Sequence, residues 1–530
     1  MALTVEQLEI LGAVLADVYQ QLERAAIADI ARRLRKTERL TETAELMAEA
    51  LRQKGYSPIA IQRQVMRELN ANPYFQQEIA ANTLAYKQTL QKQIDAAKES
   101  ARRVGREVVQ EAGNLAFRND LSMWAQGAKP VKGSAFERLI QATKKALTAD
   151  LLNLTRTTGF QLPTGAMVSA RNAYTRALNL ALAKTTSGAY SYRQAIAEAV
   201  RELAASGLRT VDYASGVSRQ LDTAARNAVM TASAQLAGQI TMDNAEQTGV
   251  DYVEVSSHWG ARTGEGHANH AAWQGKIYRI HGSDEKYGNL ERETGYPSDP
   301  AGLCGYNCRH TFYPFWPGIS EPTQWPKEPE PKEYGGRSYT YYQATQAQRR
   351  REREVRALKR EADGMKAAGL TQQARQLEGR IRAMTEEYEE FSAAMEIRPK
   401  NERLWVCEGL KINANSGIIR LSNADIPRSV DVKSTNYEIE DKATGLIYHY
   451  AEGTKVQNRE VFAGYGTNTP LHDGVAEGLT NQYGGSVEKW QHAKGIGVID
   501  DDGENVRAEI HWFQEETVGQ VKHKVKRWLE

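Results

Sequence analysis

The sequence predicts a mixed fold, with a mainly α N-terminal half, a small α+β central module, a charged helical hairpin and an α+β C-terminal domain. Three observations predict it. Apolar residues recur at helical spacing over the first half, strand-like alternation with clustered glycine and aromatic residues follows, and a highly charged helical stretch precedes further strand-like runs. These changes of pattern place the regions at 1–250, 251–320, 321–342 (a proline-rich linker), 343–397 and 400–530.

In the N-terminal half, short signals mark where individual helices begin. Ser57-Pro58 and Asn72-Pro73 each combine a capping side chain with a proline suited to the first helical position. Ser134 and Glu137 have the spacing of a capping box ahead of an apolar series at three- and four-residue steps. We therefore expect residues 1–250 to form helix after helix.

The middle of the chain changes character near residue 250. VDYVEVSSHW (250–259) alternates apolar and polar residues in the manner of a half-buried strand. EPTQWPKEPEPKEYGG (321–336) favours an extended, semi-rigid connector. Residues 343–396 return to a helical pattern that Gly369 divides into a hairpin, and their interspersed Glu and Arg predict solvent-exposed helices supported by i,i+4 pairs.

Strand-like runs return from about residue 401, and we expect a small α+β module there. DDDGEN (500–505) lies between two apolar runs and predicts a hairpin turn, whereas 473–483 predicts a helix. The basic segment VKHKVKRW (521–528) alternates in the manner of an edge strand whose lysine face is solvated.

Composition narrows the classes of function. The formal net charge of +2 gives no general reason to expect a nucleic-acid or membrane partner. The chain has no apolar stretch of about eighteen residues that would span a bilayer, and the acidic residues near its N-terminus do not fit a signal peptide. Three cysteines are too few for a secreted disulfide framework, so we expect a reducing, cytoplasmic setting.

Histidines and cysteines are concentrated in the second half. All ten histidines follow residue 257, and one segment holds His258, His267, His270, His281, Cys304, Cys308 and His310. Because zinc prefers thiolate and imidazole ligands, Cys304, Cys308, His310 and His270 form a candidate structural zinc site. The Cys-x3-Cys spacing departs from the usual two-residue knuckle, and two other interpretations stay open: a disulfide, or a packed knot in which the cysteines act as small buried hydrophobic residues. A nucleophilic cysteine is disfavoured, since Arg309 and His310 point away from Cys308 in an extended segment.

Two long motifs in the 251–320 region carry a family resemblance. They are SSHWGARTGEGHANHAAWQGKIYRI and YPSDPAGLCGYNCRHTFYPFWPG. Both resemble the signature of tailed-phage minor capsid proteins of the Mu-F-like head-morphogenesis superfamily, in the branch called phage minor capsid protein 2. The matching positions are Ala261, Arg262, His270, Trp273, Gln274, Gly275 and Lys276 in the first motif, and Gly302, Leu303, Cys304, Gly305, Asn307, Cys308, Arg309, His310, Phe312, Pro314, Phe315, Pro317 and Gly318 in the second. Flanking segments extend the likeness over roughly residues 1–395.

This resemblance implies a structural role rather than an enzymatic one. Such proteins are low-copy components of the prohead, associate with the portal, and are implicated in head assembly and in DNA packaging or ejection. The resemblance implies no catalytic or cofactor-binding residues, and it implies that the helices of 1–250 contact the portal and other capsid proteins. The expected location is the virion, in the capsid interior near the portal, after assembly in the host cytoplasm.

The C-terminal region leaves an alternative open, in which the protein is a phage-delivered effector. Some relatives carry variable C-terminal domains that look like toxins, so residues 400–530 could be an RNase-like or other toxin enzyme. Metal-independent RNA cleavage needs little more than a histidine, a lysine or arginine and a polar residue converging on a phosphate. The candidate histidines are His449, His472, His492, His511 and His523. The basic end of the chain could also contact packaged phage DNA through its phosphates.

Overall fold

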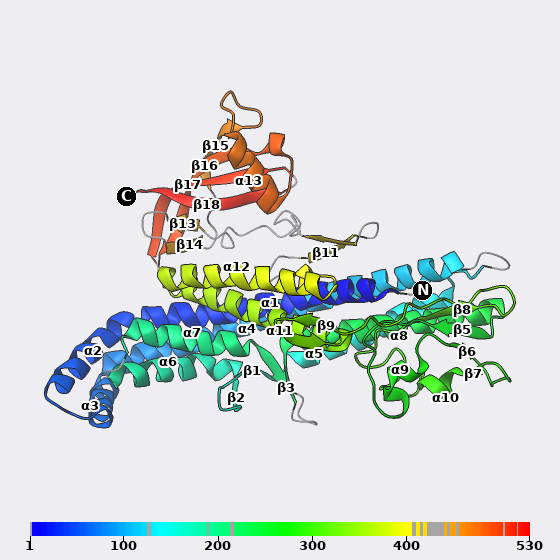
Figure 1. Cartoon of the computed structure of the whole chain (residues 1–530). Helices are drawn as coiled ribbons and strands as arrows, with labels where there is room; N and C mark the ends of the chain where they lie inside the picture. Colours follow the sequence, from blue (N-terminus) through cyan, green and yellow to red (C-terminus); the bar gives the residue numbers. More distant parts are fainter. Residues whose placement is uncertain are drawn as a thin grey trace. The chain divides into compact units, whose positions relative to one another are not determined.

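The computed structural model confirms the mixed fold class and divides the chain into two compact units. It describes residues 3–123, 129–187, 190–211, 217–404, 410–413, 417–420, 439–441, 446–451, 454, 456–501, 504–516 and 518–529. The first unit comprises Met1–Cys407 with Ile412–Ile418, and the second comprises Glu408–Lys411 with Ile419–Glu530. Each unit is described by itself below, with the element labels of Figure 1.

Long helices dominate the first unit and run side by side (Figure 1). They are α1 (Val5–Lys36), α2 (Glu38–Gln53), α3 (Pro58–Ala71), α4 (Pro73–Met123), α5 (Ser134–Leu154), α6 (Ala170–Thr186), α7 (Tyr192–Ser206) and α8 (Leu221–Thr248). Helix α1 is buried along most of its length and packs against α4, α7 and α8. Its apolar side chains therefore form the centre of the core. Among the described residues, no helix combines the length and the apolar character needed to cross a membrane.

Two of the three predicted helix starts are confirmed. The Ser57 side chain accepts a hydrogen bond from the Ala60 amide at the start of α3, and the Asn72 side chain accepts one from Phe75 at the start of α4. The predicted capping box at Ser134 is wrong. Gly133 is the N-cap of α5 without any side-chain cap, because Ser134 already lies in the first helical turn.

A small sheet interrupts the helices, so the prediction of helix after helix was incomplete. Its strands are β1 (Thr158–Gln161), β2 (Met167–Ser169), β3 (Arg209–Val211) and β4 (Ser218–Gln220), in the order β2-β1-β3-β4. Each strand has only three or four residues, which is too short for alternation to stand out in the sequence.

The central module is built on a second sheet of four strands. It comprises β5 (Tyr252–Val255), the 3-10 turn Gly266–Ala268, α9 (His270–Trp273), β6 (Ile277–Arg279), β7 (Gly288–Asn289), α10 (Leu290–Thr294) and β8 (Phe312–Phe315). The strand order is β7-β6-β5-β8, with Val253 opposite Pro314 in the antiparallel β5–β8 pair. The strand predicted from VDYVEVSSHW is confirmed as β5. Strand β8 follows the cysteine-bearing segment directly and fixes its end on the sheet.

The proline-rich segment leads into a hairpin of strands and then into two helices. The elements are β9 (Lys332–Tyr334), β10 (Arg337–Tyr339), α11 (Tyr341–Ala367), α12 (Thr371–Ala394) and the 3-10 turn Asn401–Arg403. Gly369, with φ of 68°, separates α11 from α12 as predicted. The expectation that both helices are solvent-exposed is wrong for α11. It packs against α1 and α7 and buries Arg356 and Arg360, which pair with Asp222 (3.7 Å) and Glu23 (3.4 Å).

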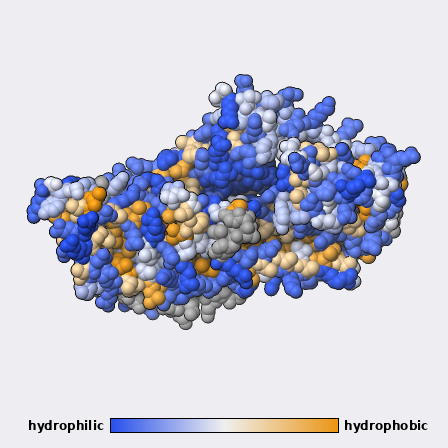
Figure 2. All heavy atoms as spheres, turned by 90° about the horizontal axis from the view of Figure 1, so that it is seen from below, coloured by the Kyte–Doolittle hydropathy of each residue, from blue (hydrophilic) through white to orange (hydrophobic). Residues whose placement is uncertain are grey.

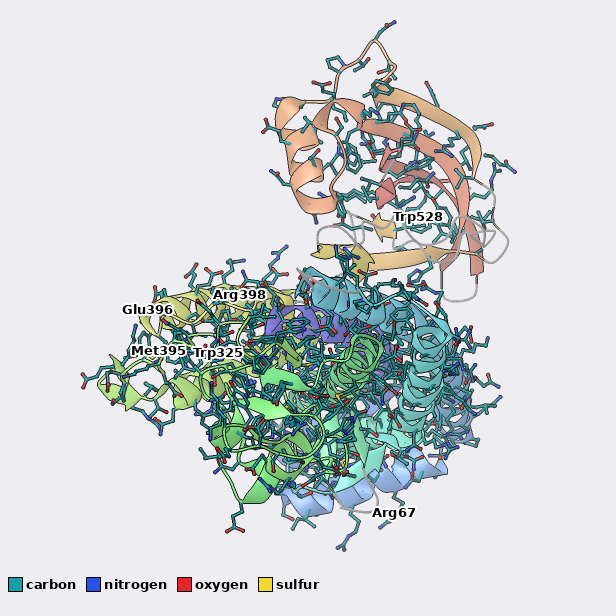
Figure 3. The ribbon with its side chains drawn as sticks, turned by 90° about the vertical axis from the view of Figure 1, so that its right-hand side faces the viewer. Arg67, Trp325, Met395, Glu396, Arg398 and Trp528 are labelled. Atoms are coloured by element: carbon teal, nitrogen blue, oxygen red, sulfur yellow. The ribbon has the colours of Figure 1, made fainter. Side chains whose placement is uncertain are left out.

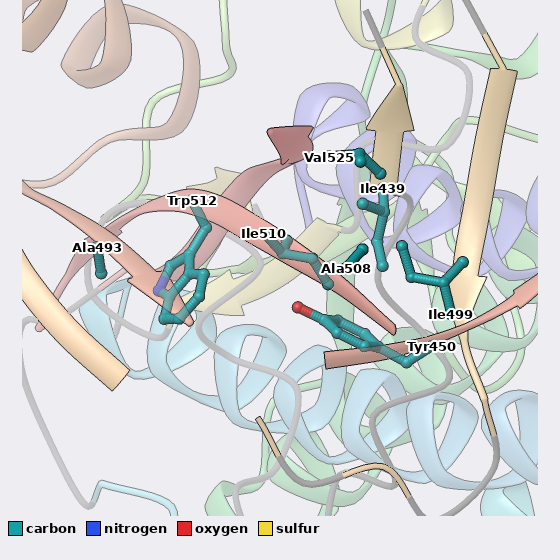
Figure 4. Close-up of a cluster of buried hydrophobic side chains, with 8 residues drawn as sticks. All are labelled: Ile439, Tyr450, Ala493, Ile499, Ala508, Ile510, Trp512 and Val525. Atoms are coloured by element: carbon teal, nitrogen blue, oxygen red, sulfur yellow. The ribbon is translucent and has the colours of Figure 1, made fainter. Parts of the chain in front are cut away.

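The second unit contains a six-stranded sheet in the order β14-β13-β18-β17-β16-β15. Its elements are β13 (Ile439–Asp441), β14 (Leu446–Tyr450), β15 (Gln457–Gly464), α13 (Asp473–Tyr483), the 3-10 turn Val487–Lys489, β16 (Gln491–Asp501), β17 (Glu504–Glu515) and β18 (Gly519–Leu529). The short strands β11 (Leu410–Asn413) and β12 (Gly417–Arg420) each have residues in both units. One face of the sheet carries a buried cluster that includes Tyr450, Ile510 and Trp512 (Figure 4).

Two of the three C-terminal predictions can be judged on the described residues. The helix predicted over 473–483 is confirmed as α13. The edge-strand prediction for 521–528 is wrong, because β18 lies inside the sheet between β13 and β17. Strands β16 and β17 pair up to Asp501 opposite Glu504, and the tip of the predicted DDDGEN turn lies outside the described residues.

Candidate site of clustered histidines and cysteines

The segment 301–310 folds into consecutive tight turns that direct both cysteines inward. Cys304 and Asn307 have positive φ angles of 60° and 56°. A Cβ atom on Gly305 would lie 2.1 Å from the carbonyl oxygen of Pro300, so only glycine fits there. The Cys308 amide donates to the Gly305 carbonyl at 3.1 Å. The glycine and asparagine of GLCGYNC therefore serve backbone geometry.

Three of the four predicted ligands come together. The donor atoms of His270, Cys308 and His310 all lie within 4.8 Å of one another, and all three residues are buried. The Cys308 sulfur lies 3.6 Å from Nδ1 of His310, so the expectation that His310 points away from Cys308 in an extended segment is wrong: the segment folds into turns that bring the two side chains together. Cys304 is also buried but lies outside this group, and its sulfur lies 3.7 Å from the main-chain oxygen of His310. We call His270, Cys308 and His310 the central triad.

Gln274 fixes which nitrogen of His310 carries the proton. Its Oε1 atom accepts a hydrogen bond from the main-chain N–H of His258 at 3.1 Å and lies 2.9 Å from Nε2 of His310. Since an oxygen that accepts from one N–H can accept from a second, Nε2 of His310 is the donor in this contact. Nδ1 of His310 therefore presents its lone pair toward the Cys308 sulfur. Our ligand prediction had missed Gln274, although it lies within the WQGK motif.

Arg262 lies against the other histidine of the triad. Its Nη2 atom is 2.7 Å from Nε2 of His270 and 2.9 Å from the carbonyl oxygen of Ala301. Nε2 of His270 also lies 3.0 Å from the carbonyl oxygen of Ala301. A guanidinium group can only donate and a carbonyl oxygen can only accept, so a neutral His270 satisfies one of these two contacts; when Nε2–H donates to Ala301, the lone pair of Nδ1 is free. Arg262 thus joins α9 to the start of the cysteine-bearing loop.

Aromatic rings enclose the triad. The His258 ring stacks on His310 with a centroid separation of 4.2 Å, and Trp273 meets His310 edge-on at 4.9 Å. His267 lies away from the triad, where it contacts Asp299 at 2.9 Å, and His281 is exposed. Five of the seven residues singled out around the site therefore contact at least one of the others: His258, His270, Cys304, Cys308 and His310.

Burial controls the protonation states of the site. Desolvation raises the pKa of Cys308 to about 11 and that of Cys304 well above its usual value. Desolvation also lowers the pKa of His270 to about 4 and that of His310 well below its usual value. The thiols and imidazoles are therefore uncharged near neutral pH, and a buried, protonated thiol does not suit nucleophilic chemistry.

The module is tied to the proline-rich segment and to α1. Buried Glu254 on β5 accepts hydrogen bonds from the Thr323 amide at 3.0 Å and from the indole of Trp325 at 3.1 Å (Trp325 is labelled in Figure 3). Thr311 donates to the main-chain oxygen of Leu3 at 2.9 Å, and Arg309 pairs with Glu9 at 2.8 Å. These contacts hold the cysteine-bearing loop against the N-terminal end of the helical core.

The five C-terminal histidines do not converge on one site. His492 and His511 are neighbours on β16 and β17, with ring centroids 5.5 Å apart. His523 stacks on Trp512 in the buried cluster, while His449 lies on β14 and His472 precedes α13. His492 stacks on Phe513 at 4.2 Å, and burial lowers its pKa to about 4. This imidazole is therefore a weak base near neutral pH.

Comparison with protein families gives one match, and it covers most of the first unit. The family described as Phage minor capsid protein 2 matches residues 3–393. Comparisons with curated proteins and with solved structures found no match. The matched range contains both motifs and the whole central triad.

Proposed function

The chain belongs to the phage minor capsid protein 2 family, and from this premise we propose that it acts at the portal during head assembly and DNA packaging or ejection of a tailed phage or prophage. The family makes it a structural protein of the phage head. The family match over 3–393 carries the proposal, because it spans the helical core and the central module together. The location that follows is the virion, in the capsid interior near the portal.

The surface of the first unit offers a place for the contacts that such a role needs. Five large apolar side chains are exposed on α2, α3, the turn between them and the first part of α4, and we call them the α2–α3 tip: Leu46, Tyr56, Ile59, Tyr74 and Leu84. Figure 2 shows hydrophobic spheres among hydrophilic ones at this end of the unit. Isolated exposed apolar residues are ordinary, but these five lie on segments that contact one another, α2 with α3 and α3 with α4, which supports a surface suited to a protein partner. We propose that the tip contacts the portal.

A pair of matched variants tests this contact. Ile59 in the tip is 70% exposed, and Ile319 after β8 is 72% exposed, so Ile→Gln at either position leaves the core intact. The Leu46→Gln/Ile59→Gln variant should fold normally yet enter phage heads at least tenfold less, because two apolar anchors contribute about 3 kcal/mol or more when buried. Ile319→Gln should enter heads like the wild type.

Cross-linking identifies the partner. A photoreactive residue at position 59 should form an adduct with the portal subunit in assembling heads, and one at position 319 should not. Adducts with the major capsid protein alone, or equal incorporation of both Gln variants, would contradict the portal contact.

We do not extend the proposal to an effector enzyme or to DNA contact. The histidines that would serve an RNase-like site are dispersed, and Lys494, next to the His492–His511 pair, is held by Glu460 at 3.0 Å. On β18, Lys524 pairs with Glu440 and Arg527 with Glu509. These pairings reduce the positive charge available to phosphates.

A further inference from the structure

We propose that the central triad of His270, Cys308 and His310 binds one zinc ion, with Cys304 outside the ligand set. The fourth position would hold a water molecule or another small ligand. This inference does not depend on the proposed role at the portal. It rests on the positions of three buried donors, on the proton that Gln274 assigns, and on the chemistry of the donor atoms.

The spacing of the donors matches a zinc site. Zn–S bonds of about 2.3 Å and Zn–N bonds of about 2.0–2.1 Å, at a tetrahedral angle, place sulfur and nitrogen about 3.5–3.6 Å apart. The Cys308 sulfur and Nδ1 of His310 are 3.6 Å apart. The triad as a whole lies within 4.8 Å, so a zinc ion needs side-chain adjustments of only about 1 Å to bind all three donors.

Gln274 prepares His310 as a ligand. Metal-bound histidines generally donate their second ring N–H to an oxygen, which fixes the tautomer and orients the ring. His310 makes this contact to Oε1 of Gln274 at 2.9 Å, and the same oxygen is held by the His258 amide. The stacked His258 ring and the edge of Trp273 restrict rotation further. The lone pair of Nδ1 is thus aimed at the position between His310 and Cys308.

The donor set selects the metal. One thiolate and two imidazoles suit zinc and also copper, whereas magnesium and calcium prefer oxygen ligands, so elemental analysis must distinguish zinc from copper. Binding would transfer the Cys308 thiol proton to solvent and form the Zn–S bond in its place. The ion would join α9 to the loop that ends in β8, and through Arg309–Glu9 to α1. The ion would therefore cross-link these segments while keeping its fourth position open to water or a small ligand.

Arg262 opposes the cation and provides an independent check. Its guanidinium lies 2.7 Å from Nε2 of His270, so its positive charge repels a metal ion on the triad. Arg262→Gln should therefore increase zinc affinity, measured as slower loss of zinc to a chelator. A triad that merely packs would show no such effect.

The experiment uses the full chain, purified reduced and without a histidine tag, after refolding with one equivalent of zinc. Elemental analysis should find about one zinc per wild-type chain and less than a tenth of that in Cys308→Ser. Cys304→Ser is the matched control, since this thiol is equally buried and also lies against the His310 carbonyl. It should retain about one zinc.

Cobalt binding is measured on the wild-type protein, so this test does not depend on whether a variant folds. Wild-type protein refolded with Co²⁺ should show a sulfur-to-cobalt charge-transfer band, which reports a thiolate ligand directly. A wild-type chain without zinc and without this band would overturn the proposal. Equal loss of zinc in Cys304→Ser and Cys308→Ser would overturn the ligand assignment.

Discussion

Replacing Glu9 by glutamine removes a buried carboxylate that three cations share. Glu9 lies on α1 and pairs with Arg309 at 2.8 Å, with Lys400 at 3.2 Å and with Arg403. Its side chain is 3% exposed, and the three partners are also largely buried. Within the first unit, these pairs join α1 to the central module and to the segment after α12.

The cost of Glu9→Gln follows from this burial. Removing one partner of a buried ion pair leaves uncompensated charge and costs about 3–5 kcal/mol. Lys400 can lose its proton, because burial lowers its pKa to about 8, but arginines stay charged. We expect a loss of about 3–5 kcal/mol, which for roughly 400 residues corresponds to about 5 °C in Tm.

Glu6→Gln is the matched control. Glu6 lies one turn earlier on α1 and pairs with Arg398, but both side chains are more than half exposed (Arg398 is labelled in Figure 3). Exposed pairs contribute little, so Glu6→Gln should cost less than about 1 kcal/mol. Denaturant unfolding monitored by circular dichroism compares the two variants with the wild type. Equal, small losses in both would refute the account of the buried network.

The pH dependence of the same variant gives a second check. Burial acts to raise the pKa of Glu9, but Arg403, Arg309 and Lys400 together hold it well below its usual 4.5. A carboxylate whose pKa is lower in the folded state than in the unfolded state stabilises the fold at pH values above its unfolded-state pKa. This stabilisation is lost as the pH falls. The stability difference between wild type and Glu9→Gln should therefore be full above about pH 5 and shrink in more acidic solution.

Three further changes give distinct expected results in thermal or denaturant unfolding. Burial raises the pKa of Asp120 to about 7 against 3.8 unfolded, so folding favours its protonated form and stability falls as the pH rises through this range. Asp120→Asn should match the wild type near pH 4 and exceed it by about 2–4 kcal/mol at pH 8; a pH-independent difference would contradict this. A Cβ on Gly113 would lie 2.2 Å from Cδ1 of Ile140, so Gly113→Ala should cost about 1–3 kcal/mol and Ile140→Val should recover most of it. Trp512→Ala should destabilise the second unit by about 3–5 kcal/mol while leaving unfolding of the first unit unchanged, and coincident shifts of both would contradict that independence.

Structural features that depend on residues close together in the sequence could be predicted. The Ser57 and Asn72 caps, the Gly369 turn and the α13 helix depend on neighbours along the chain, and all are confirmed. The cap predicted at Ser134 is wrong because Gly133 takes the cap position one residue earlier. Local patterns thus locate helices well and their first residue less well.

Features that depend on distant partners could not be predicted. The charges of α11 looked solvent-exposed because their counter-charges, Glu23 and Asp222, lie more than a hundred residues away. The alternation of β18 suggested an edge because the sequence does not show that β13 pairs with its other side. Pairing across the fold decided both cases.

The candidate site shows the same division. Its residue types marked His270, Cys308 and His310, but Cys304, with equal standing in the sequence, lies outside the group, with its sulfur against the main-chain oxygen of His310. The part that Gln274 plays in the site could not be predicted, because its hydrogen bond with His310 joins residues 36 positions apart in the sequence. Residue types locate the site, and loop geometry decides its members.

Quantification of the chain in purified heads tests the central claim most directly. Heads of the phage, or of the induced prophage, would be analysed by mass spectrometry before and after DNA packaging. The account predicts the chain in both, at a constant low ratio to the portal subunit. A chain found only in the soluble lysate, with heads assembling equally well without it, would contradict a structural role in the head.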